Sequence, residues 1–450
     1  MDADDAITTR DTSDSPGSNP GVGGGARREG QRGVALLMVL AALAIMIPFT
    51  ATFNYDAKVD FQSSVNTSDK VKARNMQRGA LRLSVLMFEL QRMVFNQKQF
   101  RQFVGGQMDI TQIAPYLMSI FGSKDGAQAI GDFVGMDTSA LGDLSLDGGG
   151  FEVRVEAESG RINVNCLHKA DSKGSKLQSQ TATMLGQLMA PSLYDPLFEE
   201  EKSDEQVYRR TDILSGIVDY VDDNRTSFDS VRLETGSAQE RYRYTELYDP
   251  YQARNARLDS LEELQLVAGV DDDWMAAFGD DLTVYGNCKI NVNFASARQI
   301  AAVLVHAVSA RDRWKTEGQN YLTMTLPLAN FVVEARQFNL FEKLTDLKTL
   351  VGKPDQYMMP AFLTGGDDEE QTTSPFIPDG LEVRVYEGCR NDSCWGGLRE
   401  VATVEPERYY RLEIITEVGA ARSRVDAVYD MQYGRSNSAG KGAWLYFREE

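Results

Sequence analysis

Histidine and cysteine are scarce in this chain, which has two His and four Cys among its 450 residues. His168 lies just after a short strand-like pattern, and His306 lies inside an apolar helical pattern. Both positions favour a packing or junction role over general acid–base catalysis. The chain also has no GxSxG, HExxH or phosphate-binding glycine loop. The sequence therefore predicts a protein that is not an enzyme.

Positive charge is in deficit as well. The 47 Lys and Arg residues stand against 66 Asp and Glu, which gives a formal net charge of −19. Because non-specific nucleic-acid binding needs a basic face, we expect no nucleic-acid partner. Hydrophobic residues make up 42% of the chain and charged residues 25%, the proportions of a globular protein rather than a disordered one.

Large apolar residues are nearly absent from residues 1–30, which are rich in Gly, Ser and Asp, and this segment is predicted to be disordered. An apolar run then starts at Val34 and reaches Phe49 without a charged residue. Extended to residue 54 it is about 20 residues long, and at about 1.5 Å per residue it matches a hydrocarbon core about 30 Å thick. We therefore expect a membrane anchor at 34–54.

Three interpretations compete for this apolar run. A core helix would normally carry a polar stripe, which is missing here. A cleaved secretory signal would need a small-x-small site after a shorter apolar core, and Ala-Leu-Ala at 42–44 is a nominal match. A cut between Gly33 and Val34 would instead remove the polar leader and leave the anchor whole. The arginines just before the run would keep that end cytoplasmic and send the following chain across the membrane.

A short Arg-Gly site followed by an uncut apolar helix resembles the class III leader of type IV pilins and type II secretion pseudopilins. In that family a membrane-embedded prepilin peptidase cuts after the glycine, here Gly33, and methylates the new terminus, here Val34. The fifth residue after the cut is Glu in most members and is Met38 here. Since K-type minor pseudopilins characteristically lack this Glu, the resemblance implies a K-type chain in which Met38 marks a position at the filament tip.

Beyond the anchor, the absence of proline and the near-helical spacing of Leu81, Val85 and Phe88 predict one helix that continues to about Asn96. Gly79 is expected to be a weak point in it. The pattern FEVRVEAESGRINVN (151–165) alternates around Ser-Gly and predicts a β-hairpin. Further strands are predicted in LEVRVYEG (381–388), YYRLEIITEVG (409–419) and SRVDAVYDMQY (423–433). About 200 mostly helical residues therefore separate the first strands from the last.

An internal repeat lies in this separating segment, where RINVNC (161–166) recurs as KINVNF (289–294). Asn side chains at such junctions can cap the start of a helix. Three Leu-periodic steps predict helices closed by glycine, namely SGIVDYVDDN (215–224), LDSLEELQLVAGV (258–270) and LFEKLTDLKTLVG (340–352). Such steps resemble SAM-like or helix-hairpin-helix units. Their alternatives are DNA-backbone binding, as in a membrane-anchored helix-hairpin-helix module, and compact helical packing, which the net charge favours.

The same segments extend the resemblance. NARLDSLEELQLVAGV (255–270) and LTVYGNCKINVNFASARQIAAVL (282–304) are similar to the central signature of the K-type pseudopilins, so the likeness spans about residues 31–432. It implies an α+β fold in which a pilin-like long N-terminal transmembrane helix packs on a small antiparallel sheet interrupted by a large inserted α-helical (SAM-like) domain. It also implies I- and J-type minor pseudopilins as partners at the tip of the pseudopilus.

The resemblance also implies a single-pass protein of the cell inner membrane with most of the chain in the periplasm. The expected organisation is a cleaved leader (1–33), the anchor (34–54) within a long helix (34–100), a pseudopilin α/β part (101–170), two SAM-like parts (171–287 and 288–375), C-terminal pseudopilin strands (376–434) and a tail (435–450).

Acidic residues cluster where one predicted helix ends. Asp219, Asp222 and Asp223 fall at i, i+3 and i+4, which brings their oxygens to one face or end of the helix, and Ca²⁺ takes several such oxygens. Calcium in the α-domain is also a property of the K-type family. Plain solvation of a helix end is the alternative interpretation.

The four cysteines are too few for a disulfide scaffold and lack the close pairs or added histidines of a zinc site. Cys389 and Cys394, separated by four residues, are expected to form a small disulfide that closes a hairpin loop in the periplasm. The distant pair, Cys166 and Cys288, flanks the two copies of the repeat and could bridge if those strands lie side by side.

Overall fold

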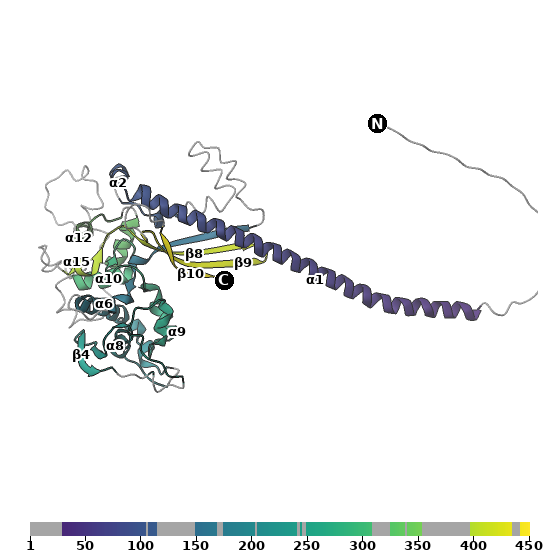
Figure 1. Ribbon diagram of the computed structural model, residues 1–450, viewed down its shortest axis with the longest axis horizontal. Helices are drawn as coiled ribbons and strands as arrows, with labels where there is room; N and C mark the ends of the chain where they lie inside the picture. Colours follow the sequence, from purple (N-terminus) through teal and green to yellow (C-terminus); the bar gives the residue numbers. More distant parts are fainter. Residues whose placement is uncertain are drawn as a thin grey trace, which may run out of the picture. The chain divides into compact units, whose positions relative to one another are not determined.

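The computed structural model describes residues 29–104, 107–114, 149–168, 174–202, 205–240, 244, 249–307, 325–337, 340–352, 397–433 and 442–450. Contacts divide the chain into two units, Met1–Ser68 and Asp69–Glu450. Figure 1 shows one long helix, a small antiparallel sheet and a group of shorter helices, which is the α+β, pilin-like fold that the sequence predicts.

Helix α1 runs from Glu29 to Leu90 and is followed by one π-helical turn, Gln91–Phe95. The prediction of a single helix to about Asn96 is therefore confirmed, and Gly79 does not interrupt it. The π turn ends the helix at a fixed point, because the Gln91 side chain accepts a hydrogen bond from the backbone N–H of Ile110 at 2.8 Å. A short helix, α2 (Lys98–Val104), comes next.

The sheet has four antiparallel strands in the order β1-β8-β9-β10, with bounds β1 Gly149–Ala157, β8 Tyr409–Val418, β9 Ala421–Asp430 and β10 Ala443–Glu449. Strands β8 and β9 confirm the predictions for 409–419 and 423–433. They form a hairpin that turns at Gly419, whose positive φ of +58° suits glycine.

Alternate residues of β8 are buried beneath α1, and aromatic rings join the two layers. Phe88 of α1 stacks on Tyr410 of β8 and Tyr429 of β9, with ring centroids 5.0 Å apart in both pairs. Phe88 and Tyr410 are almost completely buried. This stack holds the C-terminal part of the long helix on the sheet.

A large segment is inserted between β1 and β8. Its helices are α6 Gly174–Met189, α7 Pro196–Glu199, α8 Arg210–Val221, α9 Asp272–Phe278, α10 Ala297–Ala307, α12 Leu344–Gly352 and α15 Leu398–Val401. Its strand pairs are β2 Ile162–Asn163 with β5 Leu282–Thr283, β3 Thr226–Asp229 with β4 Glu234–Gln239, and β6 Ile290–Asn291 with β7 Ala402–Thr403. Short 3-10 turns occur at Glu158–Gly160, Val164–Leu167, Ser192–Tyr194, Leu261–Leu266 and Gly279–Asp281. One hydrophobic cluster, reaching from Ile162 to Ala402, serves the whole insertion.

Two sequence predictions about strands are wrong. Residues 151–165 do not form a hairpin, because the 3-10 turn Glu158–Gly160 leads the chain away from β1, and β2 then pairs in parallel with β5. Residues 435–450 are not simply a tail, because β10 joins the sheet beside β9 with a bulge between Trp444 and Tyr446. The strand predicted at 381–388 lies outside the described residues.

The aromatic stack generates a stability prediction. Phe88→Ala should lower the free energy of unfolding by about 3–5 kcal/mol, because it removes a buried ring and leaves a cavity between two tyrosines. Leu86→Ala, on the same helix but at a residue that is 63% exposed, should change it by no more than about 0.5 kcal/mol. Urea unfolding of the detergent-solubilised chain, followed by near-ultraviolet circular dichroism, measures both. Equal losses in the two variants would contradict the packing described.

Candidate functional site

The N-terminal part of α1 is the one described helix that is long and apolar enough to cross a membrane, with a mean hydropathy of 2.5 over its best window and none of that window buried. Its polar side chains are satisfied within the helix. Thr50 donates its hydroxyl to the carbonyl of Met46 (2.8 Å) and Thr52 to that of Phe49 (2.9 Å). Internal satisfaction of this kind is what hydrocarbon surroundings require.

The predicted processing residues lie on this helix. Gly33 and Val34 fall inside α1, which begins at Glu29, and Met38 follows one turn later with 65% of its surface exposed. A Cβ added at Gly33 would meet no atom within 4 Å. The helix therefore tolerates a larger residue there, and any requirement for glycine must come from a protein that acts on it. Cleavage and the tip role of Met38 stay predictions.

The internal repeat has a structural role, because both copies make the same side-chain contacts. In the first copy Asn165 accepts from the backbone N–H of Leu258 (2.7 Å) and donates to its carbonyl (3.0 Å). In the second copy Asn293 does the same with Phe341, at 2.8 and 3.0 Å. Each of these Asn residues also donates its own backbone N–H to the side chain two residues before it, Asn163 or Asn291.

The correspondence extends to the strands and helix starts. In each copy the INVN strand pairs in parallel with a Thr-bearing strand, β2 with β5 and β6 with β7. The helix start that follows Leu258 is capped by Glu263, which accepts from two backbone N–H groups. The start that follows Phe341 is capped in the same way by Asp346. Two similar modules therefore make up the insertion.

A disulfide joins the two modules. Cys166, which ends the first INVNC copy, is bonded to Cys288, which precedes the second, with 5.6 Å between their Cα atoms. The condition expected from the sequence is not how this happens, because the repeat strands pair with β5 and β7 and not with each other. Instead, the Asn163 side chain donates to the carbonyl of Gly286 and brings the segment before Cys288 alongside the first copy. Cys389 and Cys394 lie outside the described residues.

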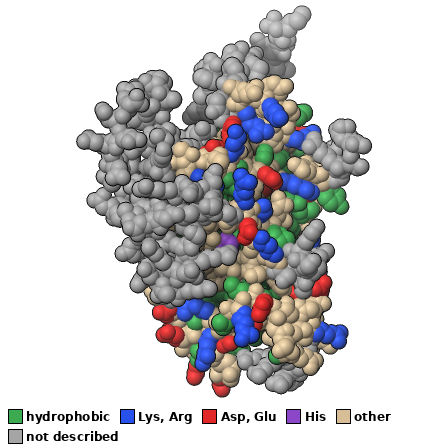
Figure 2. All heavy atoms as spheres, turned by 90° about the vertical axis from the view of Figure 1, so that its left-hand side faces the viewer, with side chains coloured by type: hydrophobic (Ala, Val, Ile, Leu, Met, Phe, Trp, Pro, Cys, Tyr) green, Lys and Arg blue, Asp and Glu red, His purple; other side chains and the backbone are tan. Residues whose placement is uncertain are grey.

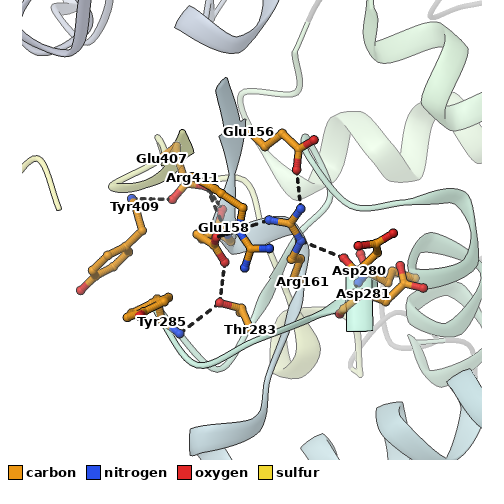
Figure 3. A network of polar contacts seen from close by, with 12 residues as sticks. Glu156, Glu158, Arg161, Asp280, Asp281, Thr283, Tyr285, Glu407, Tyr409 and Arg411 are labelled. Atoms are coloured by element: carbon orange, nitrogen blue, oxygen red, sulfur yellow. Dashed lines mark hydrogen bonds and ion pairs between the residues drawn. The ribbon is translucent and has the colours of Figure 1, made fainter. Parts of the chain in front are cut away.

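The insertion meets the sheet at a buried polar junction, shown in Figure 3. Glu158, which is completely buried, accepts from Arg411 of β8 at 2.6 Å, forms an ion pair with Arg161 at 3.4 Å, and accepts from the hydroxyl of Thr283. These partners come from the sheet, from the first INVN copy and from β5. A single carboxylate thus connects three segments that are far apart in the sequence.

A second buried carboxylate closes the entrance and exit of the insertion. Glu407 accepts from the backbone N–H of Ser159 at 3.1 Å and also from its hydroxyl, and it accepts from the N–H groups of Arg408 and Tyr409 at 2.8 Å. Burial raises the pKa of Glu407 to about 7. The chain therefore leaves the sheet after β1 and returns before β8 at adjacent points, as a loop between neighbouring strands would.

The acidic residues at the end of α8 are only partly gathered. Asp219 accepts from the N–H of Phe228 at 2.7 Å, and Asp222 accepts from the side chains of Asn224 and Gln178 at 2.7 and 3.1 Å. Burial raises the pKa of both carboxyls to about 7. In the described part of the chain, neither forms an ion pair with Lys or Arg.

Glu240, rather than the exposed Asp223, completes this cluster. Its charge contributes to the raised pKa of both Asp219 and Asp222. The β3–β4 hairpin brings it there, since its N–H donates to the carbonyl of Arg225. No pattern in the sequence marks a residue so far downstream as part of the cluster. Among the described residues, no group of three or more His, Cys, Asp or Glu side chains is arranged to hold a metal ion.

The two histidines have structural surroundings. The Nδ1 atom of His168 lies 3.0 Å from the carbonyl of Val221, and His306 is buried in α10. The apolar residues of the Leu-periodic steps, including Ile217, Leu264 and Leu347, are buried in the cluster of the insertion. These placements support packing roles for the helical steps.

Residues 160–287 match the family model for the type II secretion system (T2SS) protein K. This segment is the first module of the insertion, from its INVN strand to the disulfide, and the match confirms the K-type resemblance seen in the sequence. No curated protein matches the chain. A crystal structure of the GspK-GspI-GspJ complex from the type 2 secretion system of enterotoxigenic Escherichia coli contains a similar chain, at 15% identity, with 68% of this chain and 81% of that chain covered. Its TM-score is 0.38, which is too low for this likeness to support a further conclusion.

The cluster at Asp219 and Asp222 generates a pH prediction. Because their pKa values in the folded chain lie at about 7, above the usual 3.8, the folded state keeps protons that the unfolded state releases between these values. Stability contributed by these groups should therefore fall as pH rises from about 4 to 7. In the presence of a chelator, Asp222→Asn should be more stable than the wild type at pH 8, by roughly 1 kcal/mol, and show no such gain at pH 4.

The exposed Asp223→Asn is the matched control for this comparison and should track the wild type at both pH values. Thermal unfolding of detergent-solubilised protein measures all three chains. A gain for Asp222→Asn that is the same at pH 4 and pH 8 would contradict the burial of a costly charge.

Proposed function

On the premise that residues 160–287 belong to the protein K family of type II secretion systems, we propose that this chain is the minor pseudopilin that forms part of the tip of a periplasmic pseudopilus. In this role it initiates or caps the filament that helps export folded proteins. The observation that carries the proposal is the large insertion between β1 and β8, which are neighbouring strands of the pilin-like sheet.

The insertion supports a cap for a steric reason. A subunit in the shaft of a filament must accept neighbours above and below, so its head has to stay slim. Here more than half of the chain lies between the end of β1 and the start of β8. It forms two modules on one shared core, joined by a disulfide and by the Glu158 junction. A body of that size is held firmly and would obstruct the addition of a further subunit.

Met38 supports the same position. In pilin assemblies the family's Glu is thought to pair with the terminal amine of the neighbour above it, and an unpaired carboxylate in lipid costs several kcal/mol. A subunit at the tip has no such neighbour, so an apolar Met38 avoids the cost. We further propose that prepilin peptidase cuts between Gly33 and Val34, and that α1 anchors the mature chain in the inner membrane with the rest in the periplasm.

The I- and J-type minor pseudopilins are the partners that this role requires. We propose that they contact the long helix and the sheet, the parts shared with slim pseudopilins, rather than the insertion. This division makes the proposal testable, because the insertion can be removed between adjacent points.

Removal of residues 161–406, replaced by a short Gly-Ser linker, should leave β1 and β8 paired, since Ser159 and Glu407 already touch. The shortened chain should still copurify with the I- and J-type pseudopilins. Pseudopili assembled with it should be longer and more variable in length than those assembled with the intact chain, because the cap is gone. Electron microscopy of filaments and affinity purification measure the two outcomes.

The opposite result would identify a different role for the insertion. If the shortened chain folds but loses every partner, and filament length does not change, the insertion is a partner-binding domain and not a cap. Circular dichroism of the shortened chain separates this outcome from simple misfolding.

Calcium near Asp219 and Asp222 is a further proposal. Two carboxyls whose pKa values are raised by burial and by Glu240 would gain from a divalent cation, although the described residues do not form a complete ligand set. Calcium should then stabilise the wild type at pH 8 and have no effect on Asp222→Asn in the same unfolding series. Equal stabilisation of both chains would exclude this location.

A further inference from the structure

A basic groove lies on the second module, between the start of α12 and strand β7. It has a volume of about 420 Å³ and is lined by four cations, Lys289, Lys343, Lys348 and Arg399, against one carboxylate, Glu405. Figure 2 shows the face that carries α12 and α15, with basic side chains gathered in its upper half. This local excess of positive charge runs against the net charge of −19 of the whole chain.

The first module shows that the fold does not need these cations. When the two copies are superposed by their shared contacts, Lys343 corresponds to Ser260 and Lys348 to Gln265, both uncharged. Lys289 corresponds to Arg161, but Arg161 is engaged with Glu158 at the junction with the sheet. The basic groove is therefore a property of the second module alone, added to a framework that folds equally well without it.

The charges of the groove are not used up inside the protein. The Nζ atom of Lys289 donates to a backbone carbonyl, that of Arg399, at 2.6 Å. Within the described part of the chain, Lys289, Lys343 and Arg399 form no ion pair with a carboxylate. All three are exposed. Cations that face solvent in a concave site concentrate field lines and attract anions.

The shape of the groove favours an extended peptide. Leu344 and Val404 give it partly apolar walls. Strand β7, which also lines it, pairs with β6 on one edge and with no other described strand, so its second edge can accept an added strand. Lysines placed along such an edge would meet acidic side chains of the added segment.

Other anions fit less well. A free phosphate would favour the backbone N–H groups at a helix start, but those at the start of α12, on Glu342 and Lys343, are already taken by Asp346. A long nucleic acid would extend beyond the groove and meet the net negative charge of the chain.

We propose that this groove binds an acidic, extended segment of a partner protein. The inference does not depend on the role at a filament tip, because the groove is defined by this chain alone. It adds a docking site on the insertion, which the proposed function leaves without a partner.

The test uses the full-length chain in detergent and a fluorescein-labelled peptide of Glu-Leu-Ser repeats, with a Lys-Leu-Ser peptide of equal length for comparison. Fluorescence anisotropy should show binding of the acidic peptide alone, weakening as salt concentration rises. The variant Lys343→Ser/Lys348→Gln carries the residues of the first module and should bind roughly fivefold more weakly or worse. Lys70→Ser/Lys72→Gln makes the same charge change at exposed residues of α1 and should bind like the wild type.

Three results would overturn the proposal. One is equal affinity of the two double variants for the acidic peptide. Another is equal binding of the acidic and basic peptides. The third is no binding of the peptide while inorganic phosphate or vesicles of phosphatidylglycerol bind in a manner that depends on Lys343 and Lys348, which would make the groove an anion or lipid site. Circular dichroism confirms that each variant is folded before its affinity is compared.

Discussion

The arrangement of the second unit depends on one buried carboxylate, that of Glu158. A charge removed from water costs several kcal/mol unless partners of good geometry surround it. Glu158 has such partners in Arg411, Arg161 and Thr283, and each belongs to a different segment: the sheet, the first INVN strand and β5. If one segment moved, a buried charge would lose a partner. The insertion is therefore held to the sheet by the cost of exposing or stranding that charge, and not only by apolar contact.

The duplicated modules build on this attachment. Each uses an Asn pair to hold a distant backbone segment, and each uses an acidic side chain to cap the helix start that comes after it. Such contacts satisfy buried polar groups with few residues, so the rest of each module can vary. One such difference separates the copies: Arg161 in the first serves the junction with the sheet, whereas Lys289 in the second faces a groove. The same framework thus attaches to the sheet through one copy and offers a surface to solvent through the other.

Local pattern predicted much of the fold. The anchor, the continuous helix and strands β8 and β9 follow from apolar spacing within one segment, and the leader and repeat pointed to the family of the first module. Features that depend on distant pairing were not predictable in this way. The segment after Ala157 looked like half of a hairpin, but its pairing is decided by β5, more than a hundred residues later. The place of Glu240 beside Asp219, and the pairing of β10 with β9, likewise come from tertiary contacts that no local pattern records.

The distance between the insertion and the sheet in solution tests the role of Glu158 most directly. Spin labels at the exposed residues Val231, in the insertion, and Glu417, on β8, report it by pulsed electron paramagnetic resonance. The wild type should give one narrow distance distribution, and Arg411→Leu, which strips Glu158 of its partner on the sheet, should broaden it. Arg424→Leu removes a more exposed arginine paired with Glu413 and should leave it narrow. A broad distribution in the wild type, or an unchanged one in Arg411→Leu, would contradict the claim that Glu158 fixes the insertion on the sheet.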